Sequence, residues 1–396
     1  MLASNRTNYN QTFTTERYLA FKKDIAATYD HEPPFRLAET PIFVPTLLKK
    51  RLVEACHEIS QTIYDPRFKE WSEGAFAGGD LKVPAEDDHT LFLQMDFGIC
   101  HDEAGDLIPQ LIEVQGFPSL YFFQELLAKK FQEHFDIPDN YSCYFDGLEA
   151  DAYIELLRKN IIGETDPKQV VLLEIEPEKQ ATCIDFLCAQ DKLGLKVLCI
   201  SQLKREGKSL YYLDKNGEKV RIQKIFNRVI FDELLQRNDL PRTFSFKDEV
   251  DVEWMGHPNW FYRISKYILP LLSSQYVPES FYLNQLEEYP TDLENYVLKP
   301  LFSFAGAGVN LHINKDILDS IENKGNFIIQ KKVQYQPVLE TPNNERAKCE
   351  IRMLMLWEKE AKEAKIINNL ARITKGEMVG VKYNRDKEWV GASVAF

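Results

Sequence analysis

A lysine at the end of a predicted strand, followed by a loop with two glycines, is the first pattern in the sequence that could do chemistry. Lys299 lies in the segment YVLKPL, Gly306 and Gly308 follow in SFAGAG, and a second strand is predicted to begin at Val309. The ammonium group can meet a phosphate as a charged donor, and the glycines allow backbone N–H groups to close on a triphosphate. The spacing differs from the Walker and Rossmann patterns, which need a helix after the loop. A phosphate-binding hairpin and an ordinary hairpin with two turn glycines are therefore the two interpretations.

The segment NFIIQKKV, further along the chain, is a second candidate. Its apolar strand turns polar at the end, in the residues Gln330, Lys331, Lys332 and Val333. Such a strand end can present backbone N–H and C=O groups to the edge of a base such as adenine. An edge strand with a basic, solvated face is the alternative interpretation. The position of this segment after the lysine strand favours a nucleotide site.

Two carboxylates and an amide in the first half of the chain form a candidate metal site. Asp96 lies in QMDFG, and Glu113 and Gln115 lie in LIEVQG. Residues two apart on a strand point to one face, and a hairpin partner can bring Asp96 beside them. Mg²⁺ keeps several waters and takes phosphate oxygens, so a few oxygen ligands from the protein are enough. The alternative is that these side chains are solvated on the surface of a sheet.

Two arginines within apolar strands and one further lysine complete the set of candidate residues. Arg352 lies in EIRMLML, and Arg372 lies in LARIT on the next predicted strand. A buried guanidinium needs an anionic partner because an unpaired buried charge is costly. A transferring phosphate is one candidate partner, and a structural ion pair with Glu350 or Asp386 is the alternative. Lys266, near the start of a predicted helix, could reach the same phosphates or could lie on the surface.

The periodicity of apolar residues predicts the elements that carry these side chains. In the first part of the chain we expect helices over residues 13–30 and 43–64, capped by Thr14 or Thr46, a β-hairpin over 89–117 and a helix over 119–135. In the middle we expect a βαβ unit over 169–202, a hairpin turned at Asn216-Gly217 and a further strand. In the last part we expect a helix over 260–272, strands over 295–301, 308–313, 326–333, 349–357 and 365–374, and a helix over 315–324. This order predicts an α/β chain, α+β in part, with a doubly wound parallel unit before a largely antiparallel one.

Taken in order, these segments resemble the ATP-grasp superfamily, and most closely its circularly permuted branch, which includes the synthetase domain of glutathionylspermidine synthase. The motifs that carry the resemblance are QMDFG…LIEVQGFPS, VLKPLFSFAGAGV, FIIQKKV, EIRMLML and ARIT, with the metal segment ahead of the nucleotide segments. The resemblance spans most of residues 90–396 and implies an ATP-grasp-like fold. Three parts are implied: a helical opening with the metal-binding hairpin over 1–150, a Rossmann-like pre-ATP-grasp unit over 151–250 and an antiparallel ATP-binding clamp over 251–396.

The resemblance also implies cofactors and roles for individual residues. Lys266 and Lys299 would hold the ATP phosphates, and Gly306 and Gly308 would cover them. The adenine would lie against Gln330, Lys331, Lys332 and Val333. Mg²⁺ would be bound by Asp96, Glu113 and Gln115, while Arg352 and Arg372 would act in catalysis. The implied activity is that of an ATP- and Mg²⁺-dependent ligase that joins a carboxylate to an amine through an acyl-phosphate. Its substrates would be small molecules such as amino acids, peptides or polyamines.

The sequence departs from the family pattern at three places. Gln115 stands where the family has Asn, Gln94 stands where it has Arg, and the loop SFAGAG replaces one that carries an Arg-Glu pair. These positions bear on the cation and on the substrate. Two alternatives to the ligase therefore stay open: a catalytically inactive ATP-binding module, and a small-molecule kinase, which would need no amine.

Length and composition limit the remaining function classes. The chain has 396 residues and a formal net charge of -13, with no basic stripe, which argues against a general affinity for nucleic acid. This length predicts two or three structural units, and an oligomer is compatible with the sequence. No apolar stretch approaches the roughly 20 residues of a membrane span, so we expect a cytoplasmic protein without a membrane partner. The seven cysteines include no CxxC pair, so we expect reduced thiols.

Overall fold

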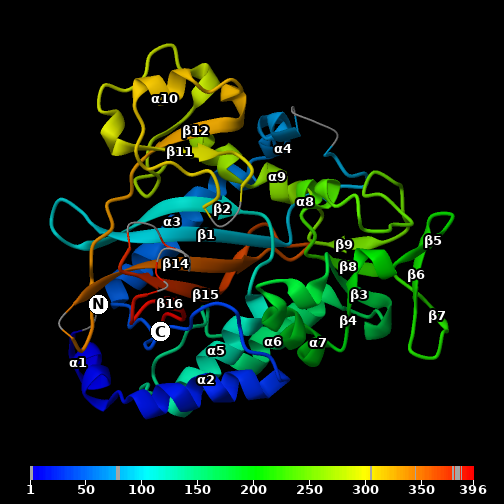
Figure 1. Cartoon of the computed structure of the whole chain (residues 1–396), viewed down its shortest axis with the longest axis horizontal. Helices are drawn as coiled ribbons and strands as arrows, with labels where there is room; N and C mark the ends of the chain where they lie inside the picture. The colour runs from blue at the N-terminus through cyan, green and yellow to red at the C-terminus, as the bar shows by residue number, and fades with distance from the viewer. Residues whose placement is uncertain are drawn as a thin grey trace.

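The computed structural model describes residues 3–76, 81–303, 306–343, 345–376, 379, 384 and 386–396. At its centre lies an antiparallel sheet in which five strands follow the order β16-β15-β14-β1-β2, while β13 pairs with β14 (Figure 1). The strands are β1 (Phe92–His101), β2 (Leu107–Gln115), β13 (Leu339–Glu340), β14 (Arg346–Leu356), β15 (Lys365–Thr374) and β16 (Gly391–Ser393). The structure confirms the hairpin predicted over residues 89–117 and the two strands predicted near the end of the chain. It also shows that the hairpin pairs directly with β14.

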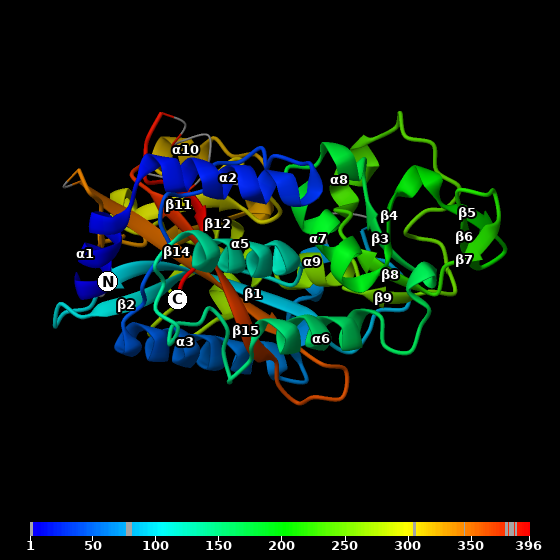
Figure 2. The same cartoon turned by 90° about the horizontal axis from the view of Figure 1, so that it is seen from below.

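Helices cover this sheet and the neighbouring parts of the chain (Figure 2). They are α1 (Ala3–Thr12), α2 (Thr15–Tyr29), α3 (Thr46–Tyr64), α4 (Phe68–Trp71), α5 (Tyr121–His134), α6 (Ala150–Ile161), α7 (Cys183–Leu193), α8 (Phe231–Gln236), α9 (Asn259–Arg263) and α10 (Lys315–Asp319). Thr14 caps α2, as predicted, and accepts a hydrogen bond from the Arg17 N–H at 3.2 Å. Thr46 is not a cap, because Pro45 takes that position and Thr46 is the first helical residue of α3. No helix within the described ranges is long and apolar enough to cross a membrane.

The two faces of β1 are packed differently, and this places the polar residues of the strand. Leu93 and Met95 belong to the hydrophobic core that includes α3, whereas Phe92 belongs to the core that includes α5. Successive side chains of a strand point to opposite faces, so Gln94 and Asp96 share the face of Phe92. Both side chains are buried. A carboxylate therefore lies inside the protein, on an interior strand of the sheet.

A parallel sheet with the order β4-β3-β8-β9 lies beside the central sheet (Figure 1). Its strands are β3 (Val170–Glu174), β4 (Lys196–Cys199), β8 (Lys224–Asn227) and β9 (Glu253–Met255). β3 and β4 are parallel and α7 joins them, which confirms the predicted βαβ unit. An antiparallel sheet of β5 (Lys204–Glu206), β6 (Ser209–Leu213) and β7 (Lys219–Arg221) follows β4 in sequence, and Gly217, with φ of 81°, makes the predicted turn.

A third sheet with its own small core stands above the central sheet in Figure 1. Its order is β10-β12-β11, with β10 (Ser280–Tyr282), β11 (Tyr296–Pro300) and β12 (Phe327–Lys331). The prediction of a strand over 308–313 is wrong, because this segment makes a single isolated bridge, from Asn310 to Leu298 of β11. Gly306 and Gly308 have φ of 71° and 72°, and the Asn310 side chain accepts a hydrogen bond from the His312 N–H at 2.9 Å. These conformations turn the chain instead of extending it.

The helix predicted over 260–272 is broken in two, and the break sets the position of Lys266. α9 ends at Arg263, and a 3₁₀ helix covers Lys266–Leu271. Between them Ser265 is extended, with φ of -145°, and its side chain accepts a hydrogen bond from the Tyr267 N–H at 3.2 Å. This is the arrangement of an N-cap, and Pro270 in addition lacks the N–H of a regular helix. Lys266 therefore begins a helix of its own.

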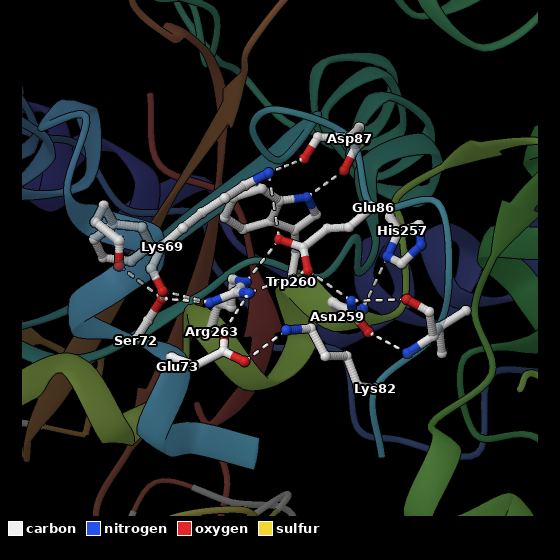
Figure 3. Close-up of polar contacts among 12 residues, drawn as sticks. Lys69, Ser72, Glu73, Lys82, Glu86, Asp87, His257, Asn259, Trp260 and Arg263 are labelled. Atoms are coloured by element: carbon white, nitrogen blue, oxygen red, sulfur yellow. Dashed lines mark hydrogen bonds and ion pairs between the residues drawn. The ribbon is translucent and has the colours of Figure 1, made fainter. Parts of the chain in front are cut away.

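Polar contacts fasten the segment that precedes β1 to α9 (Figure 3). Arg263 lies 2.7 Å from the Glu86 carboxylate through Nε, and 2.8 Å from the Glu73 carboxylate through Nη2. The Asn259 side chain donates to Glu86 at 2.6 Å and accepts from the Val83 N–H at 2.8 Å. We call Glu73, Glu86, Asn259 and Arg263 the α9 latch. It holds in place the short helix from which the chain continues to Lys266.

The latch predicts a large loss of stability when its buried cation is removed. The Arg263 side chain is 3% exposed and that of Glu86 is 11% exposed, so Arg263→Ala leaves a buried carboxylate without its main partner. We expect the free energy of unfolding to fall by about 3 to 5 kcal/mol, measured by denaturant unfolding. Lys82→Ala is the control, because Lys82 is half exposed where it pairs with Glu73, and it should cost less than about 1 kcal/mol. Equal losses in the two variants would contradict the role of the latch.

Candidate functional site

The two predicted lysines meet the predicted metal hairpin. Lys299, in β11, donates from Nζ to the Ile112 carbonyl at 2.9 Å and to the Gln330 side-chain oxygen at 2.5 Å. Lys266 lies 3.1 Å from the Glu113 carboxylate and donates to the Ser303 carbonyl at 2.8 Å. Residues from opposite halves of the chain therefore share one location, as the sequence predicts.

Asp96 lies between two arginines. Arg352, directly opposite on β14, donates from Nη2 to the Asp96 carboxylate at 2.7 Å, and Arg372 of β15 donates to the same carboxylate at 2.6 Å. Arg372 also pairs with Glu350 at 2.8 Å. The structural ion pair predicted as the alternative for these arginines is confirmed for Arg372 with Glu350, whereas neither predicted partner is that of Arg352. The partner is Asp96, because the strand register places these two residues face to face.

The β1-β2 hairpin has the expected geometry. Asp96 lies opposite Glu113 in the register of β1 and β2, and Gln94 lies opposite Gln115. The Gln115 amide donates a hydrogen bond to Glu113, which confirms that the two side chains share a face. Gln94 accepts from Arg352 at 3.1 Å and donates to the Ser119 carbonyl at 3.0 Å. The Gln94 side chain thus holds Arg352 from a second side.

The site gathers four cationic side chains and three carboxylates. They are Lys266, Lys299, Arg352 and Arg372, and Asp96, Glu113 and Glu350. Burial lowers the pKa of Lys299 to about 8, although Glu113 acts in the opposite direction. Burial also opposes ionisation of Asp96, yet its two arginines hold the pKa of that carboxyl below its ordinary value. Ionised groups that are this strongly buried must all be paired.

Glu113 and Glu350 differ in protonation tendency although they lie in the same cluster. Burial opposes ionisation of Glu113, but Lys266, Arg352 and Lys299 together outweigh it and keep the pKa of that carboxyl lowered. Burial raises the pKa of Glu350, and Arg372 only partly offsets this effect. The Tyr335 hydroxyl donates a hydrogen bond to Glu350. Glu113 is therefore the better cation ligand of the two.

The segment after β12 is less open than predicted. The backbone N–H groups of Lys331 and Lys332 donate to the carbonyls of Glu279 and Asn295, at 2.8 and 2.7 Å. The prediction that these two N–H groups face a base edge is therefore wrong, because neighbouring strands and turns already bind them. The Gln330 side-chain nitrogen, in contrast, is buried and has no hydrogen-bond partner among the described residues.

Two glycines allow close approach of the chain within the site. A Cβ at Gly98 would lie 2.8 Å from side-chain atoms of both Val333 and Tyr335, so this glycine lets the segment after β12 cross β1 beside Asp96. Sequence reasoning missed Gly98, although it is part of the motif QMDFG. A Cβ at Gly308 would lie 2.7 Å from Pro300, so Gly308 keeps the predicted loop against the lysine strand. Residues 304–305 of that loop lie outside the described residues.

A cavity of about 30 Å³ lies between the β1-β2 hairpin and the loop after β11, bordered by residues such as Glu113, Gln115, Lys266 and Ser303. This volume is enough for about one water molecule. Ser303 Oγ and Arg372 Nε are buried without a hydrogen-bond partner among the described residues. In the described ranges no group of three or more His, Cys, Asp or Glu is arranged for a metal. Of the three predicted metal ligands, Glu113 and Gln115 border this cavity, and Asp96 is not among its lining residues. Their carboxylate and amide oxygens are donors that would suit Mg²⁺ together with phosphate oxygens.

The fold is similar to that of a solved protein. A glutathione synthetase-like effector from Globodera pallida, in its apo form, aligns with a TM-score of 0.59 and 12% identity over 96% of each chain. A putative gamma-glutamylcysteine synthetase from Methylobacillus flagellatus aligns with a TM-score of 0.38 and 10% identity over 87% of this chain and 86% of that one. No protein-family model and no curated protein sequence matches this chain. The first similarity confirms the predicted ATP-grasp-like fold, a mixed α/β architecture with parallel and antiparallel sheets, and a shared fold does not by itself establish an activity.

The buried carboxylate predicts a pH-dependent contribution to stability. Asp96→Asn leaves Arg352 and Arg372 short of negative charge, so we expect a loss of about 3 to 5 kcal/mol at pH 7 in denaturant unfolding. Because the pKa of Asp96 is lowered in the folded protein, its contribution is present above the unfolded pKa of about 3.9 and is lost as the pH falls through the folded value. The difference between wild type and variant should therefore shrink only below about pH 4.

The control is Asp136→Asn, which removes an exposed carboxylate that pairs with Arg17. It should cost less than about 1 kcal/mol. A loss for Asp96→Asn no larger than this, or one that does not shrink at all between pH 4 and pH 2, would show that the buried ion pairs do not stabilise the fold in the way the geometry indicates.

Proposed function

We propose that this protein is an ATP- and Mg²⁺-dependent ligase that joins a carboxylate to an amine through an acyl-phosphate. The observation that carries the proposal is the meeting of Lys266 and Lys299 with the carboxylates of the β1-β2 hairpin at one site. The fold shared with the glutathione synthetase-like effector supports the proposal. The resemblance that implied the order of metal and nucleotide segments also implied such a fold. In this proposal the parallel sheet is the Rossmann-like pre-ATP-grasp unit, and the β10-β12-β11 sheet with its loops is the antiparallel nucleotide clamp.

Each group of side chains has a proposed role. Lys266 and Lys299 hold ATP phosphates under the loop of Gly306 and Gly308, and the segment Gln330–Val333 borders the adenine. Asp96, Glu113 and Gln115 hold Mg²⁺, which would neutralise phosphate charge when bound. Arg352 and Arg372 stabilise the charge on the phosphoryl group during transfer.

The proposed chemistry has two steps. A carboxylate oxygen of the substrate attacks the γ-phosphorus of ATP, the bond to the β-phosphate oxygen breaks, and ADP leaves. The amine nitrogen then attacks the carbonyl carbon of the acyl-phosphate, inorganic phosphate leaves, and the amine loses a proton to water. The protein contributes mainly by positioning the reactants and by placing fixed positive charge where negative charge develops.

Binding in this site requires an exchange of ion-pair partners. The carboxylates proposed to bind metal are paired with Arg352, Arg372 and Lys266 in this structure. A polyphosphate alone would pair with these cations and leave the buried carboxylates without partners. A metal ion alone would leave the buried lysines and arginines without partners. Each buried charge left unpaired costs several kcal/mol. The two ligands together satisfy both sets, so nucleotide and metal should bind in mutual dependence.

Calorimetric titration tests this dependence. ATP with Mg²⁺ should bind at least roughly tenfold more tightly than ATP with a chelator. Lys299→Ala should weaken binding at least about tenfold, because a charged hydrogen bond to phosphate is worth about 1.5 to 3 kcal/mol. Glu113→Gln should abolish the gain from Mg²⁺ without unfolding the protein. Lys315→Ala, which removes an exposed lysine on α10, is the control and should bind ATP like the wild type. If the wild-type protein gives no heat of binding with any nucleotide, the proposal is refuted.

The lowered pKa of Lys299 predicts how nucleotide affinity varies with pH. The ammonium form is present below the pKa of about 8 and is lost above it, so ATP affinity should be constant near pH 7 and should fall as the pH rises beyond 8. Lys299→Arg keeps its charge throughout this range and should give a flat profile. A wild-type profile as flat as that of the Arg variant would show that Lys299 does not contact phosphate.

A second candidate is an ATP-binding protein without turnover. It is favoured by the internal ion pairs of the site and by Gln115, whose amide N–H donates a hydrogen bond to Glu113. A small-molecule kinase is the remaining alternative. These three functions are distinguished by incubating the protein with ATP, Mg²⁺ and pooled amino acids and polyamines and analysing the products by mass spectrometry. A ligase yields ADP and an amide, and a kinase yields ADP and a stable phosphorylated product. A binding protein forms no product, although ATP raises its melting temperature.

A further inference from the structure

A cavity of about 290 Å³ lies beside the α9 latch and shares no lining residue with the cavity of the candidate site. It is bordered by the last turn of α3, the segment 65–69, the residues just before β1, Trp260 of α9 and Trp357 directly after β14. Its volume corresponds to about ten water molecules at roughly 30 Å³ each. This is the low end of the range for ligand pockets, which suits a small molecule.

The walls of this cavity are mainly aromatic. Tyr64 meets Trp357 edge to face, with ring centroids 4.6 Å apart. His89 stacks on Trp357 at 4.0 Å with an interplanar angle of 12°. The polar atoms of these rings are bound elsewhere, since Trp357 donates its indole N–H to the Ala361 carbonyl at 2.9 Å and Tyr64 accepts from the Ala364 N–H at 2.8 Å. Rings held in this way offer apolar edges and π faces to a ligand.

The latch fixes the remaining walls (Figure 3). Trp260 donates its indole N–H to the Asp87 carboxylate. Lys69 donates to the Asp87 carbonyl at 2.6 Å and lies 3.5 Å from Glu86, which in turn is held by Arg263. The cavity therefore does not close without breaking hydrogen bonds, and the positive charge of Lys69 is already compensated.

The uncompensated charge at the cavity is negative. Asp65 is bound through both carboxylate oxygens by Arg67, each at 3.0 Å. Asp88 is exposed, and its carboxylate has no hydrogen-bond or ion-pair partner among the described residues. An anionic ligand would face this carboxylate, whereas a cation would gain a partner and could rest against the aromatic rings.

We propose that this cavity binds a small organic ammonium ion, with its cationic head toward Asp88 and its hydrocarbon part against Tyr64 and Trp357. The proposal combines a carboxylate free to pair, a compensated lysine and fixed aromatic walls in one cavity. It does not depend on the proposed ligase activity, because the two cavities have no residue in common.

A matched pair of ligands tests the charge preference. The ¹⁵N-labelled protein is titrated with n-butylammonium and separately with n-butyrate, which has a chain of the same length and the opposite charge, while the indole N–H signals are followed by NMR. The signals of Trp260 and Trp357, assigned with Trp→Phe variants, should shift with butylammonium, with a dissociation constant in the millimolar range, and should not shift with butyrate. Equal responses to both ligands, or no response to the amine, would overturn the proposal.

Asp88→Lys tests the site itself, because this substitution on the surface reverses the charge without touching the core. It should weaken butylammonium binding by roughly tenfold or more, while the indole signals of the free protein keep their dispersion. Asp139→Lys is the matched control, since Asp139 is also exposed and lies outside the lining of this cavity. Unchanged affinity in Asp88→Lys, or the same loss in both variants, would assign the binding to general surface charge and would overturn the proposal.

Discussion

The ion pairs between Asp96 and the two arginines set the conditions for everything else in the site. Asp96 is 2% exposed, so bulk water contributes little to the stabilisation of its charge. A carboxylate in that position persists only if cations are fixed beside it, and those cations are themselves buried or partly buried. Arg352 is held further by Gln94, and Arg372 by Glu350. Each charge thus requires the next one, and the network extends across β1, β14 and β15.

The central sheet makes this network possible because β1 pairs with β2 on one side and with β14 on the other. Asp96 is the residue of β1 that lies opposite both Glu113 and Arg352. Strands from opposite ends of the sequence therefore deliver anions and cations to one row. The lysines come from outside the sheet, from β11 and from the 3₁₀ helix that follows the α9 latch. A fault in any of these supports would leave a buried charge without its partner.

Local patterns were sufficient to predict part of this arrangement. The alternation of side chains along a strand places Glu113 and Gln115 on one face, and the pairing of a hairpin brings Asp96 beside them. The partner of Arg352 could not be predicted in the same way, because it depends on the register between strands that are far apart in sequence. The same holds for the N–H groups of Lys331 and Lys332, whose acceptors belong to other segments. The break before Lys266 was visible in part, since Pro270 stands within the predicted helix, but the cap formed by Ser265 depends on the folded backbone.

The identity of residue 94 connects the fold with the charge of the site. The resemblance to the permuted ATP-grasp branch implies an arginine at this position, beside Arg352 and in the same buried row. With Gln94 the site has four cations against three carboxylates, and an arginine would raise this to five against three. Each additional buried like charge is strongly unfavourable unless an anion compensates it. A protein with arginine at residue 94 would therefore depend more on a bound polyphosphate, whereas Gln94 allows this site to remain folded and internally paired without one. In the proposed function, nucleotide and metal would have to replace these internal partners together, because either ligand alone would leave buried charges unpaired.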